Sequence, residues 1–193
     1  MLRRNTIVLL TTVALIAPMI CARADMPSLD PQLALPLLFK VLAYDESLDA
    51  RHDSTIAAYA VYDPDNAASY RLWTKSKEFV RNNPDLRVRG RRVDLRPLAL
   101  AQSKDPSGLA VADRYGIILL LNIDSSAAVA VADTARARGY HTFAFPATAM
   151  PPATGVALTW DGNRPAIVVN LPVTQAEGSQ YSSRLLQVCR VIR

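Results

Sequence analysis

Apolar residues follow two different periods along the chain and divide it into strands and helices. Residues 55–62 and 115–122 are nearly continuous apolar runs, which are typical of strands covered on both faces of a sheet. The second run is the more hydrophobic, so we expect it at the centre. Residues 86–89 alternate between apolar and arginine, and residues 141–145 form another short strand. The alternation slips at Arg91 and Arg92, which predicts a β-bulge.

Helical spacing and capping residues predict four helices. Asp30 and Pro31 are suited to the N-cap and first position of a helix that reaches Tyr44 and is apolar almost all round. Residues 67–81 form a second helix, and residues 125–138 an alanine-rich third helix that Gly139 ends. The fourth is expected to run from Gly178 to the last residue. Its apolar face is formed by Tyr181, Leu185, Val188, Cys189 and Ile192.

The order of these elements predicts the fold class. Strands that alternate with helices indicate an α/β protein, a three-layer sandwich with a mainly parallel sheet and helices on both faces. Residues 156–160 and 166–170 are joined by a turn at 161–163, which adds an antiparallel C-terminal hairpin. Residues 97–113 and 146–154 are expected to form loops or short helices. We therefore predict a single domain over residues 25–193.

The first 24 residues have the pattern of a signal peptide. Arg3 and Arg4 precede an apolar run from Ile7 to Ile20, and residues 22–24 form an A-x-A cleavage site. Cleavage after Ala24 would deliver the protein to the periplasm with no membrane-spanning segment. The leader contains three of the 22 basic residues and none of the 17 acidic ones. The remaining net charge of +2 gives no support to nucleic-acid binding.

Residues with catalytic or metal-binding chemistry are sparse. The chain has no G-x-S-x-G, G-x-G-x-x-G or P-loop motif, and its two histidines, His52 and His141, lack partners at metal-ligand spacing. We therefore expect no enzyme activity, no metal and no cofactor. Cys189 would be the single cysteine after cleavage, and its place on an apolar face predicts a buried thiol without a disulfide.

Two surfaces are candidates for contact with a partner protein. The outer side of the first helix carries Leu37, Val41 and Tyr44, which can pack inside the fold or form a partner or dimer interface. Arginines cluster between residues 81 and 96 and include Arg87 and Arg89. They are suited either to a solvated edge strand or to a docking patch for an acidic protein or anionic ligand.

Polar residues follow several of the predicted strands. In open α/β sheets ligands bind beyond the carboxyl ends of the strands. Asp63, Asn122 and Asp124 occupy such positions, and Thr148 lies in the proline-rich loop after residues 141–145. These four side chains are candidate ligand contacts, although residues of these types also cap helices and form turns.

The C-terminal 39 residues resemble the end of the YfiR family of periplasmic proteins. The similar positions are Gly155, Trp160 to Gly162, Ile167 to Asn170, Ala176 to Gly178 and Ser182 to Leu186. Phe39 and Lys40 in the first helix, the I-x-x-Y-x-V-Y-D strand and residues 117–121 agree in order, so the similarity runs from about Leu33 to the end. It implies an α/β sandwich that often dimerises and that represses an inner-membrane diguanylate cyclase through its periplasmic domain, which lowers cyclic di-GMP.

The chain departs from that family in two places. Residues 40–45 read K-V-L-A-Y-D where typical members have K-F-V-x-W-P, and the paired cysteines are absent, so control through a disulfide is not expected. The sequence thus predicts a divergent periplasmic protein that restrains an inner-membrane signalling protein, a diguanylate cyclase or sensor kinase, by direct contact. The alternatives are a small solute-binding protein and, third, a secreted hydrolase.

Overall fold

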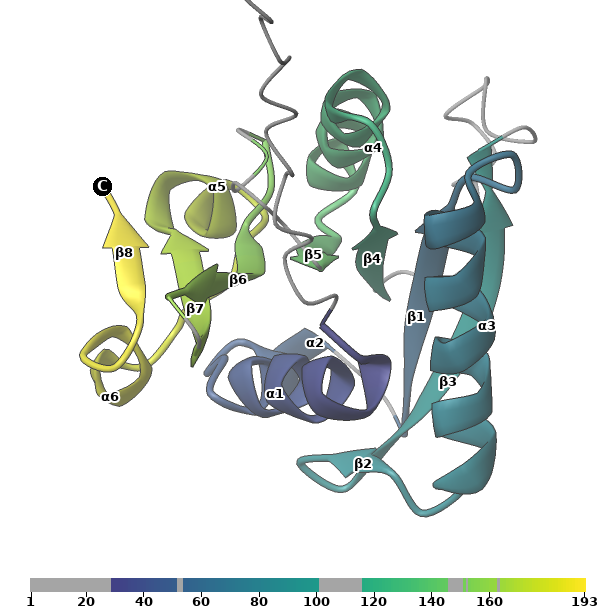
Figure 1. Ribbon diagram of the computed structural model, residues 1–193. Coiled ribbons are helices and arrows are strands. Elements are labelled where there is room, and N and C mark those ends of the chain that lie inside the picture. The colour runs from purple at the N-terminus through teal and green to yellow at the C-terminus, as the bar shows by residue number, and fades with distance from the viewer. Residues whose placement is uncertain (1–28, 52–53, 101–115, 146–150, 152, 163) are drawn as a thin grey trace, which may run out of the picture.

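The chain forms a mixed sheet with helices packed on it (Figure 1). The computed structural model describes residues 29–51, 54–100, 116–145, 151, 153–162 and 164–193. The strands are β1 (Thr55–Tyr62), β2 (Arg87–Val88), β3 (Arg91–Ala99), β4 (Gly116–Leu121), β5 (His141–Phe145), β6 (Val156–Asp161), β7 (Arg164–Asn170) and β8 (Arg190–Ile192). The helices are α1 (Pro31–Ala43), α2 (Leu48–Arg51), α3 (Ala67–Asn82), α4 (Ser125–Ala137), α5 (Leu171–Ala176) and α6 (Ser183–Leu186).

Strand order confirms the predicted mainly parallel sheet. Within the described residues the order is β2-β3-β1-β4-β5-β6-β7-β8, so β2 and β8 are the two edges. The pairs β1–β3, β1–β4, β4–β5, β5–β6 and β7–β8 are parallel. The hairpins β2–β3 and β6–β7 are antiparallel. The apolar strand β4 is central, as predicted, and every one of its residues is buried.

Two cores lie on opposite faces of this sheet, which makes the fold a three-layer sandwich. On one face Leu38 of α1 and Trp73 of α3 belong to the same buried cluster as Ile56 of β1. On the other face Val131 of α4 packs in a cluster with Tyr59 of β1. Residues of β1 alternate between the two clusters because successive side chains of a strand point to opposite faces. The continuous apolar run in β1 is explained by this double coverage.

The ends predicted for α1 and α4 agree with the structure. The Asp30 side chain accepts a hydrogen bond from Gln32 N at 2.9 Å, and Pro31 begins α1. The Asp124 side chain caps α4 in the same way. Gly139 has a φ of +71° just after α4, a conformation that glycine adopts at little cost.

The predicted bulge at Arg91 and Arg92 is wrong. The slip in alternation marks a two-residue hairpin turn, because Arg89 (φ +47°) and Gly90 (φ +82°) reverse the chain between β2 and β3. Strand β3 also continues through Pro97, which we had assigned to a loop. The N–H of Arg92 faces β1, where it donates to Ser54 O at 3.1 Å, so position 97 faces the opposite side, beyond the end of β2. A proline there removes no ladder hydrogen bond.

The predicted C-terminal helix is also wrong. The segment after Gly178 contains only the short α6, and residues 190–192 instead extend the sheet as β8 beside β7. Of the five residues assigned to one buried face, Leu185 is buried, but Val188 is 79% exposed. Cys189 is half-buried rather than buried. The helical spacing was outweighed by backbone pairing with β7, whose outer edge would otherwise lack a neighbour.

Candidate functional site

The carboxyl ends of β1 and β4 form the topological switch point of the sheet. The two strands are parallel neighbours, with Val61 opposite Leu120. After β1 the chain enters α3 on one face, whereas after β4 it enters α4 on the other face. The next parallel strands, β3 and β5, lie on opposite sides of this pair. In open α/β sheets, ligands bind at the point where the connections diverge in this way.

Ser69 of α3 joins the two strand ends. Its Oγ donates a hydrogen bond to Leu121 O at 2.5 Å and accepts one from Asp63 N at 2.9 Å. Ser69 is buried, and Asn66 holds the first turn of α3 in place by accepting hydrogen bonds from Ala68 N and Ser69 N. The backbone at both strand ends is therefore fixed, which is a condition for a preformed binding site.

Three of the four predicted ligand contacts lie at this edge of the sheet. Asp63 is half-buried at the end of β1, while Asn122 and Asp124 are exposed after β4. Asn122 has a φ of +49°. The Asp124 carboxylate accepts hydrogen bonds from Ser126 Oγ (2.6 Å), Ser126 N (2.8 Å) and Ala127 N (3.1 Å). We call Asp63, Asn122 and Asp124 the switch-point edge. Thr148, the fourth residue, lies outside the described residues.

The hydrogen bonds at Asp124 also set its charge. The Ser126 hydroxyl and then the backbone N–H of Ala127 hold the pKa of Asp124 below its usual range. The side chain is therefore anionic at neutral pH. Asp63 uses one carboxylate oxygen to accept Asp65 N at 2.9 Å. The switch-point edge thus presents acceptor oxygens together with the Asn122 amide, which both donates and accepts.

A second group of polar residues, which sequence analysis missed, is buried near the amino end of β5. This amino-edge cluster consists of Asp45, His141, Thr142, Glu177 and Ser179, and all five side chains are buried. Thr142 is hydrogen-bonded through Oγ1 to Glu177 Oε1, donates its N–H to Glu177 Oε2 at 3.2 Å, and accepts Gly155 N at 2.7 Å. Asp45 Oδ1 accepts hydrogen bonds from Ser47 N (2.9 Å), Ser47 Oγ (2.7 Å) and Gln180 N (2.9 Å).

Three members of this cluster have the residue types of a serine hydrolase. Ser179 Oγ is hydrogen-bonded to His141 Nδ1, and His141 Nε2 lies 3.6 Å from Asp45 Oδ2. Ser179 is only 4% exposed, and the other two are at most 1% exposed. A nucleophile must reach its substrate, so the observed arrangement does not present one. What it does is connect the loop after α1, strand β5 and the segment after α5. That the chain is not an enzyme stays a prediction.

Glu177 is the most perturbed acid in this cluster. Burial raises its pKa to about 8, although the hydrogen bonds with Thr142 and the positive charge of Arg136 act in the opposite direction. At neutral pH the side chain is therefore mostly protonated. A neutral carboxyl group can be buried at far lower cost than a carboxylate, which accounts for an acid in the interior.

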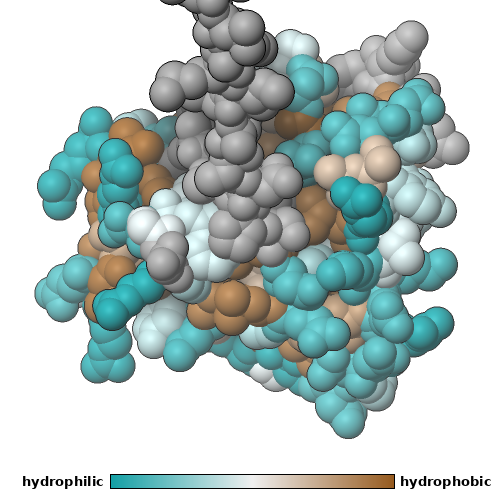
Figure 2. Space-filling model, in the orientation of Figure 1, coloured by the Kyte–Doolittle hydropathy of each residue, from teal (hydrophilic) through white to brown (hydrophobic). Residues whose placement is uncertain are grey.

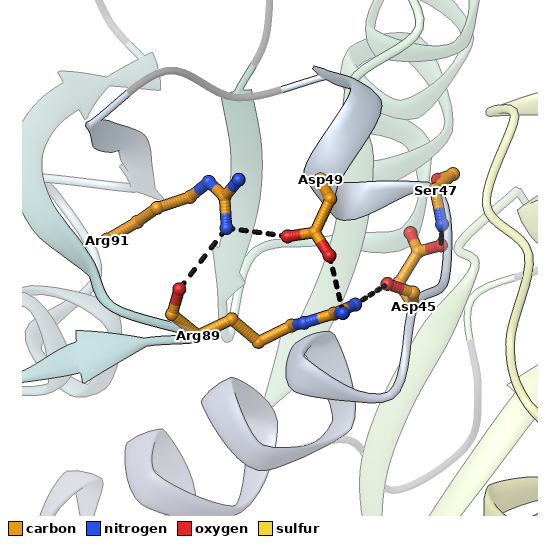
Figure 3. A network of polar contacts seen from close by, with 5 residues as sticks. All are labelled: Asp45, Ser47, Asp49, Arg89 and Arg91. Carbon is orange, nitrogen blue, oxygen red and sulfur yellow. Dashed lines mark hydrogen bonds and ion pairs between the residues drawn. The ribbon is translucent and has the colours of Figure 1, made fainter.

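The predicted partner-binding arginines lie on the β2–β3 hairpin. Arg89 Nη2 and Arg91 Nη1 contact the Asp49 carboxylate at 2.5 and 2.8 Å, and Arg89 Nη1 donates to Asp45 O at 3.1 Å (Figure 3). Arg87 is exposed and donates to the carbonyls of Pro84 and Leu86, both at 3.1 Å. Arg89 is thus engaged within the fold, whereas Arg87 faces solvent.

The predicted apolar partner surface on α1 needs a correction. Val41 is only 1% exposed, and Leu37 and Tyr44 are half-buried against the core. Helix α1 contacts α3 and β2 as well as the sheet, so the side that we expected to be exposed is covered by the protein itself. Leu33 is the exposed large apolar residue of this helix. Apolar areas on the face in Figure 2 form separate patches among hydrophilic ones.

The described residues were compared with the requirements of a metal site and of a membrane-spanning helix. Among those residues no group of three or more histidine, cysteine, aspartate or glutamate side chains is arranged to hold a metal ion. No helix there is long and apolar enough to cross a membrane.

Comparison with known proteins finds a similar fold in several solved structures. No protein-family model and no curated protein matches the sequence. A conserved domain protein from Vibrio cholerae has a TM-score of 0.58 and 12% identity over 84% of this chain. The ABC domain from Streptococcus pneumonia in complex with L-Trp has a TM-score of 0.56 and 10% identity over 80%. The ligand-free, open structure of CD0873, a substrate-binding protein with adhesive properties from Clostridium difficile, has a TM-score of 0.55 and 12% identity over 77%.

These matches concern the fold alone, because the sequence identities are low. The matched regions span 60%, 59% and 58% of the three solved chains, so this chain corresponds to a little over half of each of them. The resemblance to the YfiR family is not tested by them and stays a prediction. The chain has an α/β fold that is similar to that of these three solved structures.

Proposed function

We propose that the chain is an exported, non-catalytic binding domain that holds a small polar solute at the switch-point edge. The observation that carries the proposal is that Asp63, Asn122 and Asp124 directly follow β1 and β4, where the connections after the two strands diverge to opposite faces. The fold shared with substrate-binding proteins supports this function over a role in protein contact alone. Export to the periplasm rests on the pattern of the first 24 residues.

The chemistry of the edge favours a solute that is rich in hydrogen-bond donors. Asp63 and the anionic Asp124 offer acceptor oxygens, and the Asn122 amide can pair with a group of either kind. Asn122 has a positive φ, a backbone conformation that glycine adopts with the least strain. An asparagine at this position therefore costs some conformational free energy. A hydroxylated or amine-bearing metabolite fits these groups better than an anion does.

The Asn122→Gly variant separates a binding role of this side chain from its backbone role. Glycine accepts a φ of +49° without strain, so the variant loses the amide while it keeps the loop. A metabolite that stabilises the wild-type protein in a thermal-shift screen is expected to lose most of its Tm shift with the variant. At about 100 times Kd, a bound ligand adds about 2.7 kcal/mol to the free energy of unfolding.

Asn82→Gly is a suitable control, because Asn82 is an exposed asparagine at the far end of α3. It should leave the ligand-induced shift unchanged. Asp63→Asn retains an acceptor for Asp65 N and tests the charge alone. A ligand whose Tm shift survives both Asn122→Gly and Asp63→Asn binds elsewhere, and that result contradicts the proposed site.

Restraint of an inner-membrane signalling protein by direct contact is the second candidate function. Because Val41 is buried, the surface of α1 no longer supports contact with a partner. The exposed arginines of the β2–β3 hairpin favour a negatively charged partner. A neighbouring gene that encodes a membrane cyclase or kinase with a periplasmic domain would identify the protein to test. Titration of that purified domain should then give a complex, and size-exclusion chromatography would separate it from a homodimer.

A further inference from the structure

Four arginines lie within six residues of the β2–β3 hairpin. We call residues 86–92 the basic hairpin, and its charged side chains are those of Arg87, Arg89, Arg91 and Arg92. Within the described residues, the one carboxylate that contacts them belongs to Asp49, which binds Arg89 and Arg91 (Figure 3). Four guanidinium groups within six residues make this edge of the sheet strongly basic.

Arg87 and Arg92 are directly opposite each other across the two strands. Both are exposed, and their side chains lie on the same face of the hairpin, because opposed residues of an antiparallel pair share a face. Neither forms an ion pair with an acidic residue in the described part of the chain. Like charges directly opposite each other destabilise a β-hairpin, so this pair weakens the fold.

The turn of the hairpin contains a second unfavourable choice. Arg89 has a φ of +47°, a region in which asparagine or glycine is ordinarily found in such turns. The Arg89 guanidinium is used within the fold, where it contacts Asp49 and Asp45 O. The exposed pair Arg87 and Arg92 has no acidic partner among the described residues, and a departure from local preference without such compensation is expected at a functional site.

The backbone of β2 is also available for pairing. Strand β2 is an edge of the sheet. Arg92 donates its N–H to Ser54 O on the side of β1, so Arg92 and Arg87 do not exchange hydrogen bonds. The N–H and C=O of Arg87 therefore point to the open edge. Because β2 has only two residues, Arg87 alone offers these groups, and one pair of backbone hydrogen bonds can add to side-chain contacts with an extended segment.

We propose that the basic hairpin is a docking surface for an extended acidic segment of a partner protein. Guanidinium groups bind carboxylates through paired hydrogen bonds, and Arg87 and Arg92 offer two such groups side by side. Nucleic acid is disfavoured because residues 86–92 contain no aromatic side chain on which a base could stack. A membrane surface is disfavoured because the two apolar residues of the basic hairpin are not exposed: Leu86 is half-buried and Val88 is buried.

A labelled oligo-glutamate peptide is the probe for this surface. Its binding to the full chain can be followed by fluorescence anisotropy at about 10 mM salt, where the Debye length is about 30 Å. The double variant Arg87→Gln and Arg92→Gln is expected to raise Kd about tenfold. Its Tm should equal or exceed the wild-type value, because the repulsion between the two arginines is removed.

The matched control removes the same charge from the opposite edge of the sheet. Arg184 and Arg190 are exposed, at α6 and β8, and Arg184→Gln with Arg190→Gln should change Kd less than about twofold. If both double variants raise the Kd of the peptide equally, binding depends only on the net charge of the protein, and the proposal is overturned. Undetectable binding of the peptide to the wild-type chain would overturn it as well.

Two further probes distinguish the class of partner. Single-stranded DNA and vesicles of anionic phospholipid are titrated under the same conditions. Tighter binding of either probe, with the same dependence on Arg87 and Arg92, would assign the basic hairpin to that partner and overturn the protein-segment proposal. The inference goes beyond the solute site, because Asn122→Gly should leave peptide binding unchanged.

Discussion

Raising the pH from about 5 to about 9 is expected to lower the free energy of unfolding by on the order of 3 to 5 kcal/mol through Glu177 alone. The carboxyl group is buried in the amino-edge cluster, and burial raises its pKa from 4.5 to about 8. The folded state therefore holds a proton that the unfolded state has already released in this range. The stabilisation is complete below about pH 4.5 and is lost as the pH rises through about 8.

The Glu177→Gln variant should remove this pH dependence. Glutamine resembles the protonated acid, because its carbonyl can accept the Thr142 N–H and its amide can donate to Thr142 Oγ1. Urea unfolding at several pH values gives the free energy of both proteins, and their difference isolates Glu177 from other groups that titrate in the same range. A wild-type protein whose stability is level from about pH 5 to about pH 9 would contradict the prediction.

Replacing Asp45 with alanine is expected to lower the free energy of unfolding by about 3 to 5 kcal/mol. Its Oδ1 accepts hydrogen bonds from Ser47 N, Ser47 Oγ and Gln180 N, and the side chain is fully buried. Truncation leaves these part-buried donors without their acceptor and opens a void where the buried carboxylate was, and both changes destabilise the folded state. The loss is measured by chemical denaturation at constant pH.

Two companion variants test the cause. Asp45→Asn keeps an acceptor at Oδ1, so its loss should be about half as large or less. Asp49→Ala removes an acid four residues away whose side chain is 50% exposed, and its ion pairs with Arg89 and Arg91 should contribute about 1 kcal/mol or less. A loss from Asp45→Ala that is no larger than that from Asp49→Ala would show that the buried contacts contribute little.

Local patterns predicted most of the elements, because local physics decides them. Asp30 and Asp124 begin helices with side chains that accept N–H groups within three residues, and such short-range bonds can be recognised from sequence. The apolar run in β4 likewise indicates a strand buried on both faces. The C-terminal segment was mispredicted because the available edge of β7, which no local pattern reveals, decides the conformation of residues 190–192.

The part of the candidate sites that follows from strand order could be predicted from the sequence. The rule for strand ends identified Asp63, Asn122 and Asp124, and the structure brings them to one edge. The amino-edge cluster could not be predicted, since Ser179 meets His141 across 38 residues and Gln180 meets Asp45 across 135. No spacing rule connects such positions. Val41 was misassigned because apolar residues all round α1 do not tell which side the protein covers.

The link between Asp45 and the segment 179–182 also has a consequence for how the chain folds. Besides the Gln180 contact, Glu46 N donates to Gln180 O at 2.8 Å, and Ser182 N donates to Tyr44 O at 3.1 Å. These bonds fasten the end of the first helix to residues that leave the ribosome more than 130 positions later. Contacts so distant in sequence form slowly, because a large loop must close first. Helix α1 should therefore acquire its full protection from hydrogen exchange only after synthesis has passed residue 182.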